Sequence, residues 1–143
     1  MSAESTTTGP VPGNLGRVLV IDDEPGIRRF ALRVIESAGY QVIEAGDGPQ
    51  GLEIFARQKP EIVAIVMDLS MPGMEGPELA RALRQLDPGI PVLVMSGYSD
   101  SEVAEKLAGT GVSEFVKKPF RPQELIARLG QALSRETPAG NTP

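Results

Sequence analysis

The chain contains no cysteine and no histidine. Without cysteine it can form no disulfide, no thiolate metal site and no thiol nucleophile. Without histidine it can form neither a histidine-ligated zinc site nor a Ser-His-Asp triad. It also has no histidine of its own that could carry a phosphoryl group, so any phosphohistidine must come from a partner.

Long apolar stretches and an excess of positive charge are also missing. The longest apolar run, Ile62–Met67, is far shorter than the roughly 20 residues needed to cross a bilayer. The first residues have neither the basic region nor the apolar run of a secretory signal. The formal net charge of −5 disfavours nucleic-acid binding, which depends on Lys and Arg neutralising phosphates. We therefore expect no membrane insertion, no direct nucleic-acid binding and a cytoplasmic location.

The residues that are present fit one α/β domain. A length of 143 residues, with 41% hydrophobic and 23% charged residues, is ordinary for a single globular domain. Residues 1–16 and 136–143 are rich in Thr, Gly and Pro and have no apolar period, so we expect disordered tails around a folded unit at residues 17–135. Within that unit, short apolar runs alternate about five times with amphipathic stretches, which is typical of a parallel sheet covered by helices.

The spacing of apolar and turn residues places five strands and five helices. Ile62–Met67 is uniformly apolar and largely β-branched, which predicts a central strand buried on both faces. The final helix should point Leu125, Ile126, Leu129 and Leu133 inward. Strands are expected at Arg17–Ile21, Gln41–Ala45, Ile62–Met67, Pro91–Met95 and Glu114–Val116, and helices at about Pro25–Ala38, Pro49–Arg57, Pro77–Leu86, Ser99–Leu107 and Pro122–Leu133.

Polar residues follow four of the expected strands. The first strand leads into Asp22-Asp23-Glu24, the third into Asp68, the fourth into Ser96 and the last into Lys118. In an open α/β sheet, ligands bind beyond the carboxyl ends of the strands, where the strand order reverses. We therefore expect these side chains to lie at one rim of the sheet.

Each of these residues also has a purely structural interpretation. The acids before Pro25 could cap the following helix. Asp68 could be a turn residue that opens a Gly- and Pro-rich loop. Ser96 could cap a helix or occupy a turn, and Lys118 could be a solvated surface lysine. Taken together, these interpretations need four unrelated coincidences at one sheet edge, which favours a shared function.

Three carboxylates that converge on one pocket repel each other, which raises at least one pKa unless a cation neutralises them. Mg2+ prefers oxygen ligands, keeps several waters, and typically binds one or two carboxylates plus phosphate oxygens. An Asp carboxylate can act as the nucleophile that forms an acyl phosphate. Lys118 and the Ser96 hydroxyl could supply positive charge and a hydrogen bond to the phosphoryl oxygens. The rim residues therefore predict a magnesium-assisted phosphoryl-transfer site.

Four motifs, VLVIDDEP, IVMDLSMPGMEG, VLVMSGY and FVKKPF, occur in this order between Arg17 and about Arg135. They closely resemble the motifs of bacterial two-component response-regulator receiver domains, the CheY-like superfamily. The resemblance implies a flavodoxin-like (βα)5 doubly wound fold, with a five-stranded parallel sheet in order 2-1-3-4-5 and helices on both faces. It also implies that Asp68 is the phosphoacceptor.

The resemblance assigns further roles to individual residues. Ser96 would be the hydroxyl residue of the site and Lys118 its lysine, while Ser96 and Phe115 would form the switch. Lys117 would be a surface residue, and the peptide bond before Pro119 would be cis. Mg2+ would be bound by Asp23 directly, by Asp22 mostly through water, by Asp68, and by the backbone carbonyl of Ser70.

The implied function is signalling. The domain would take a phosphoryl group from a histidine kinase or a histidine phosphotransfer protein and switch a binding surface for an unknown downstream target protein. It would not be an enzyme, apart from catalysing its own phosphorylation and dephosphorylation. The alternatives within the family are a phosphorelay intermediate and a receiver module cut from a hybrid histidine kinase. The initial Met and the tails favour a stand-alone regulator, and the short stretch after the last helix predicts no effector domain.

Three other functions fit the sequence less well. A phosphatase of the haloacid-dehalogenase type needs a second acid two residues after its nucleophile, where this chain has Ser70. A flavodoxin-like flavin carrier would place a phosphate in the first loop, where Asp22 and Asp23 would repel it. A pseudo-receiver that only binds partners would not need the complete set of rim residues.

Overall fold

A computed structural model of the chain describes residues 15–112 and 114–135. Most of the two predicted tails, residues 1–16 and 136–143, lies outside the described residues. Five parallel strands form one sheet in the order β2-β1-β3-β4-β5, as the resemblance predicts. The strands are β1 (Arg17–Ile21), β2 (Gln41–Ala45), β3 (Ile62–Asp68), β4 (Val92–Ser96) and β5 (Glu114–Lys117), and the helices are α1 (Pro25–Ser37), α2 (Gly48–Gln58), the 3-10 helix η2 (Lys59–Glu61), α3 (Gly76–Leu86), α4 (Asp100–Leu107) and α5 (Pro122–Arg135).

Local signals set the helix ends. The Asp47 side chain accepts a hydrogen bond from the Gln50 amide at the start of α2. Ser99 and Glu102 form a capping box at the start of α4, so this helix begins one residue later than predicted. Gly39, with a φ of 105°, follows the end of α1 in the conformation that glycine adopts most easily. The other limits either coincide with the predicted ones or shift by one or two residues, and η2 was not predicted.

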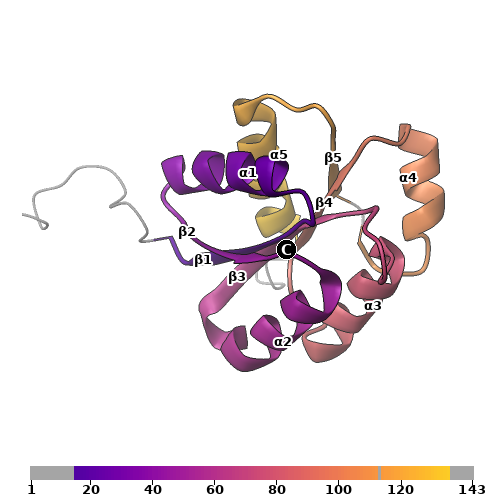
Figure 1. The fold of residues 1–143 in the computed structure, drawn as a ribbon, viewed down its shortest axis with the longest axis horizontal. Helices are drawn as coiled ribbons and strands as arrows, with labels where there is room; N and C mark the ends of the chain where they lie inside the picture. Colours follow the sequence, from indigo (N-terminus) through magenta and orange to yellow (C-terminus); the bar gives the residue numbers. More distant parts are fainter. Residues whose placement is uncertain (1–14, 113, 136–143) are drawn as a thin grey trace, which may run out of the picture.

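The alternation of side chains along the strands builds two cores. Figure 1 shows α1 and α5 on one face of the sheet and α2 and α3 on the other. Successive residues of a strand point to opposite faces, so Val18 and Val20 belong to one core while Leu19 and Ile21 belong to the other. The core beneath α1 and α5 includes Val18, Val20, Ile35, Val66, Leu125 and Leu129, and the core beneath α2, α3 and α4 includes Leu19, Ile21, Phe55, Met67, Leu79 and Val103.

The predicted inner face of α5 needs one correction. Ile126 was expected to point inward, but 36% of its surface is exposed. Among the described side chains of this helix, the buried ones are Leu125, Leu129 and Ala132. They are spaced four and three residues apart, which keeps them on one helical stripe, while Ile126 lies about 100° around the helix from Leu125.

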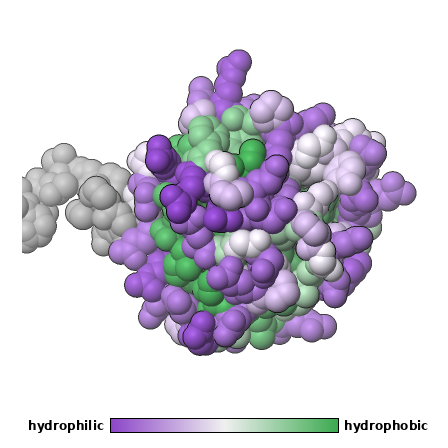
Figure 2. All heavy atoms as spheres, viewed as in Figure 1, coloured by the Kyte–Doolittle hydropathy of each residue, from purple (hydrophilic) through white to green (hydrophobic). Residues whose placement is uncertain are grey.

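The outer surface is mostly polar on the side drawn in Figure 2, with one apolar patch over α1 and α5 and another at the lower left, near β2 and α2. Phe30 of α1 is 42% exposed, and its ring stacks on that of Phe120 with the centroids 5.7 Å apart. Within the described part of the chain, none of the helices has the length and apolar character needed to span a membrane.

Candidate functional site

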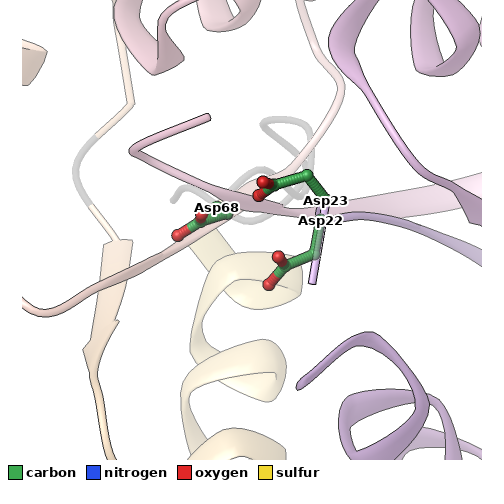
Figure 3. Close-up of side chains that lie close together, drawn as sticks. All are labelled: Asp22, Asp23 and Asp68. Carbon is green, nitrogen blue, oxygen red and sulfur yellow. The ribbon is translucent and has the colours of Figure 1, made fainter. Parts of the chain in front are cut away.

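The carboxyl ends of β1 and β3 bring three aspartates together. Ile21 lies beside Met67 in the sheet, so Asp22 and Asp68 are the next residues along two neighbouring strands. Asp23 follows in the β1–α1 loop. One carboxylate oxygen from each aspartate lies within 4.8 Å of the others. Figure 3 shows the three side chains gathered at this edge of the sheet, as the sequence predicts.

The β1–α1 loop uses Asp22 in a way that the sequence did not indicate. The acids before Pro25 could have capped α1, but Glu24 occupies the N-cap position and its side chain makes no capping hydrogen bond. Instead, Asp22 Oδ1 accepts a hydrogen bond from the Glu24 amide at 2.9 Å. The Asp22 amide also donates to the Ala45 carbonyl at 3.1 Å. Asp22 is therefore fixed inside the loop with none of its surface exposed.

Lys118 reaches these carboxylates from the end of β5. Its Nζ donates to Asp68 Oδ1 at 3.0 Å and lies 3.7 Å from Asp22 Oδ2 and 4.0 Å from Glu24 Oε1. The peptide bond to Pro119 is cis, as predicted. The neighbouring Lys117 is exposed, which confirms it as a surface residue.

Burial and charge act against each other at this rim. Burial raises the pKa of Asp22 and Asp68, and this effect exceeds the lowering caused by hydrogen bonds and by the Lys118 charge. Burial alone would lower the pKa of Lys118. Its hydrogen bond to Asp68, together with the charges of Asp68, Asp22 and Glu24, outweighs burial and raises that pKa. Lys118 is thus cationic at neutral pH, and one lysine faces an excess of carboxylates.

The donor set fits an oxygen-preferring divalent cation. Asp22 Oδ2 is buried and has no hydrogen-bond partner among the described residues. A buried carboxylate oxygen without a hydrogen bond is costly unless a cation compensates it. The carboxylates of Asp23 and Asp68 lie close enough to share one ion with it.

Ser96 lies at the end of β4, and Ser70 lies in the loop that follows β3. Ser96 is buried at the end of β4, and its Oγ accepts a hydrogen bond from the Tyr98 amide at 2.9 Å. Ser70 is exposed, and its backbone amide donates to the Asp68 carboxylate. The predicted role of the Ser70 carbonyl as a metal ligand stays a prediction.

Phe115 lies on β5, beside Val94 of β4 in the sheet. Its side chain is half-buried and packs against the core beneath α2, α3 and α4. It also lines a groove of about 420 Å³ whose other walls include Val103, Leu107 and Val112. The residue predicted to be the switch aromatic therefore contacts the space beside α4.

Residues 18–130 match the family model of the response regulator receiver domain. This match agrees with the arrangement of the rim residues on the sheet. The chain belongs to this family. It is therefore the phosphoaccepting module of two-component signalling. This assignment sets aside the phosphatase and flavin-carrier alternatives.

Relatives and solved structures match most of this chain. The response regulator MprA of Mycolicibacterium vanbaalenii is 36% identical over 124 residues, which cover 85% of this chain and 52% of that protein. A receiver domain protein from Clostridium thermocellum has 28% identity and a TM-score of 0.77 over 85% of this chain and 96% of that chain. The chemotaxis protein CheY4 of Vibrio cholerae has 29% identity and a TM-score of 0.75 over 82% of this chain and 98% of that chain. The chain spans about half the length of the curated relatives it matches.

Three interactions around the receiver site were missed by the sequence analysis. Arg28 Nη1 donates a hydrogen bond to the backbone carbonyl oxygen of Asp22 in the β1–α1 loop. Lys106 Nζ lies 4.8 Å from the centre of the Tyr98 ring. Glu114 is buried on β5, with its Oε1 3.8 Å from Nη1 of Arg128 on α5. Only Glu114 carried a signal, as an acid at the start of a short apolar strand, because an arginine or lysine on a helix looks like any solvated side chain.

Proposed function

We propose that Asp68 accepts a phosphoryl group from the phosphohistidine of a histidine kinase or a histidine phosphotransfer protein. The observation that carries this proposal is the 3.0 Å hydrogen bond from Lys118 Nζ to Asp68 Oδ1, beside two further carboxylates from the loop after β1. A carboxylate is an established nucleophile for phosphoryl groups. A fixed cation beside it is suited to stabilise the charge of the phosphoryl oxygens in the transition state.

In the proposed step, one Asp68 carboxylate oxygen bonds to phosphorus while the phosphorus–nitrogen bond of the donor breaks. The electron pair of that bond leaves with the donor imidazole. Lys118 stays beside the acceptor and neutralises phosphoryl oxygen charge, and the Ser96 hydroxyl donates a hydrogen bond to another oxygen. Such a transfer depends mainly on alignment and charge neutralisation, which these fixed side chains supply.

The proposed cofactor is Mg2+. Asp23 would bind it directly, Asp22 mostly through water, and Asp68 and the Ser70 carbonyl would complete the protein ligands. When bound, Mg2+ supplies positive charge that offsets the carboxylates and the incoming phosphoryl oxygens. The buried Oδ2 of Asp22, which has no hydrogen-bond partner among the described residues, supports a cation at this place.

The proposed output is a change on the surface formed by α4, β5 and α5. Ser96 now accepts from the Tyr98 amide, and it would turn its hydroxyl toward the phosphoryl group. Phe115 would then move into the space that Ser96 leaves. A phosphoryl group can shift the populations of two arrangements only through contacts that differ between them, and the Ser96 hydrogen bond is such a contact.

The proposal concerns a receiver of residues 17–135 that acts as a signalling switch rather than as an enzyme on other substrates. Its target protein and its cytoplasmic location remain predictions. The relatives described above are response regulators and a chemotaxis regulator, which favours the switch over a phosphorelay intermediate or a hybrid-kinase module.

Incubation with acetyl phosphate and Mg2+ tests the proposal. Intact-mass spectrometry should show one added phosphoryl group on the wild type and none on Asp68→Asn. Omission of Mg2+ with EDTA present should also prevent the gain in mass, because the carboxylates would then repel the donor. If Asp68→Asn gains the group, or if the wild type gains it in EDTA, the assigned site is wrong.

A further inference from the structure

The side chain of Arg28 connects three parts of the receiver rim. Arg28 lies in the first turns of α1, and its Nε donates to Oε1 of Glu44 on β2 at 2.8 Å. Its Nη1 donates to the backbone carbonyl oxygen of Asp22 at 2.8 Å. Only 17% of the Arg28 side chain is exposed. The guanidinium therefore ties the β1–α1 loop to both the following helix and the outer strand.

The carbonyl that Arg28 binds belongs to the peptide group between Asp22 and Asp23. The Asp22 side chain has its own anchors, since its amide donates to Ala45 and its Oδ1 accepts from the Glu24 amide. The Asp23 carboxylate makes no hydrogen bond with any described residue, so its direction depends on the backbone that carries it. A bond that fixes the preceding peptide plane therefore fixes Asp23 more than Asp22.

The positive charge of Arg28 is neutralised by the adjacent Glu44. Glu44 accepts from Arg28, and this hydrogen bond lowers the pKa of Glu44, so the acid stays ionised beside the guanidinium. A guanidinium can donate to two acceptors in a rigid fork, which an ammonium cannot do. The pair thus holds the loop without leaving an uncompensated positive charge near a cation site.

We propose that Arg28 is a positioning residue that holds the Asp22–Asp23 peptide and thereby presents the Asp23 carboxylate to the divalent cation. This inference rests on the proposed function, because it assumes that Asp23 is a metal ligand. Arg28 acts through the backbone and touches neither the ion nor the phosphoryl group. Partners that orient metal ligands commonly affect metal affinity by about 10–100-fold when they are removed.

The neighbouring Arg29 is the matched control. Its Nε donates to the same Glu44 oxygen at 3.1 Å, but 61% of its side chain is exposed and its hydrogen bond with Glu44 does not reach the loop. Arg28→Met and Arg29→Met remove the same charge and the same kind of salt bridge. Only the first removes the bond to the Asp22 carbonyl.

Binding of Mn2+, measured by electron paramagnetic resonance on the folded protein without phosphodonor, tests the inference. We expect the dissociation constant of Arg28→Met to rise about tenfold and that of Arg29→Met to stay within about twofold of the wild type. The dissociation constant of Arg28→Lys should lie between these two values, since an ammonium lacks the rigid fork with which the guanidinium donates to both acceptors. Circular dichroism confirms that each variant is folded.

Phosphorylation by acetyl phosphate at increasing Mg2+ supplies the second readout. Arg28→Met should need more Mg2+ for its half-maximal rate but should reach the wild-type maximum, which a general loss of structure would not produce. The inference is overturned if folded Arg28→Met and Arg28→Lys bind Mn2+ like the wild type, or if Arg29→Met loses as much affinity. Because Mn2+ binding is measured without phosphodonor, this failure is distinct from a failure of Asp68 to accept phosphate.

Discussion

The aspartate side of the rim and the α4 side are built differently. On the aspartate side, Asp22 and Asp68 are buried, and Lys118 and backbone amides contact their carboxylates. On the other side, α4 has eight residues and buries only Val103 and Leu107. The chain after α4 passes through Gly109 and Gly111, both with positive φ. Chemistry at the first side needs fixed groups, whereas a signal needs an element that rearranges at small cost.

Two routes join the aspartate side to the α4 side. The Tyr98 amide donates to Ser96 Oγ, and Lys106 of α4 lies over the Tyr98 ring. Phe115 connects β5 to the groove beside α4. A change in the Ser96 hydroxyl can therefore reach α4 through the Tyr98 loop as well as through Phe115.

The largest effect should come from removing the cation on the aspartate side. Lys118→Met deletes the hydrogen bond to Asp68, and the initial rate of phosphorylation by acetyl phosphate should fall by roughly 100-fold or more, as for loss of one charge-stabilising donor. Lys117→Met removes the exposed neighbour and should leave the rate nearly unchanged. Intact-mass spectrometry over time measures both rates. Equal rates in the two variants would contradict the claim that the aspartate side needs its fixed groups, since Lys118 would then be dispensable.

A smaller effect concerns the free energy of unfolding, which the buried charges of the aspartate side lower. Burial raises the folded-state pKa of Asp22, so its ionisation at neutral pH opposes folding. Asp22→Asn should therefore increase the free energy of unfolding by about 1 kcal/mol at pH 7 in EDTA. The exposed Asp100 of α4 is the control, and Asp100→Asn should change stability by less than about 0.5 kcal/mol.

The sign of the pH dependence follows from the raised pKa. The contribution of protonated Asp22 is fully present below its unfolded pKa of about 3.9 and is lost as pH rises through the folded value. The advantage of Asp22→Asn should therefore shrink as pH falls from 7 toward 4. Urea unfolding at several pH values measures it. An advantage that is constant with pH would show that burial of the charge is not its cause.

Much of the fold and site could be predicted because each depends on local patterns. Short apolar runs that alternate with amphipathic stretches predict a parallel sheet covered by helices, and parallel strands bring the residues at their carboxyl ends to one edge. Asp22, Asp68 and Lys118 meet there as predicted.

What could not be predicted depends on contacts between distant elements. Nothing in the sequence marks Arg28 as the residue that bonds the Asp22 carbonyl, because its target is a backbone atom. Ile126 was misplaced because its hydrophobicity suggested burial, while the packing of α5 selects a stripe that passes beside it.

The most direct test of this account follows amide NMR signals when beryllofluoride, a mimic of the aspartyl phosphate, binds with Mg2+. The account predicts large shifts at Ser96, at Phe115 and along Gly97–Leu107, and small shifts in α2 at Gly48–Gln58. Ser96→Ala should bind the mimic but show smaller shifts along α4, because the hydroxyl that distinguishes the two arrangements is missing. Shifts confined to Asp22, Asp23 and Asp68 would contradict the account, since the domain would then carry a phosphoryl group without reporting it through α4.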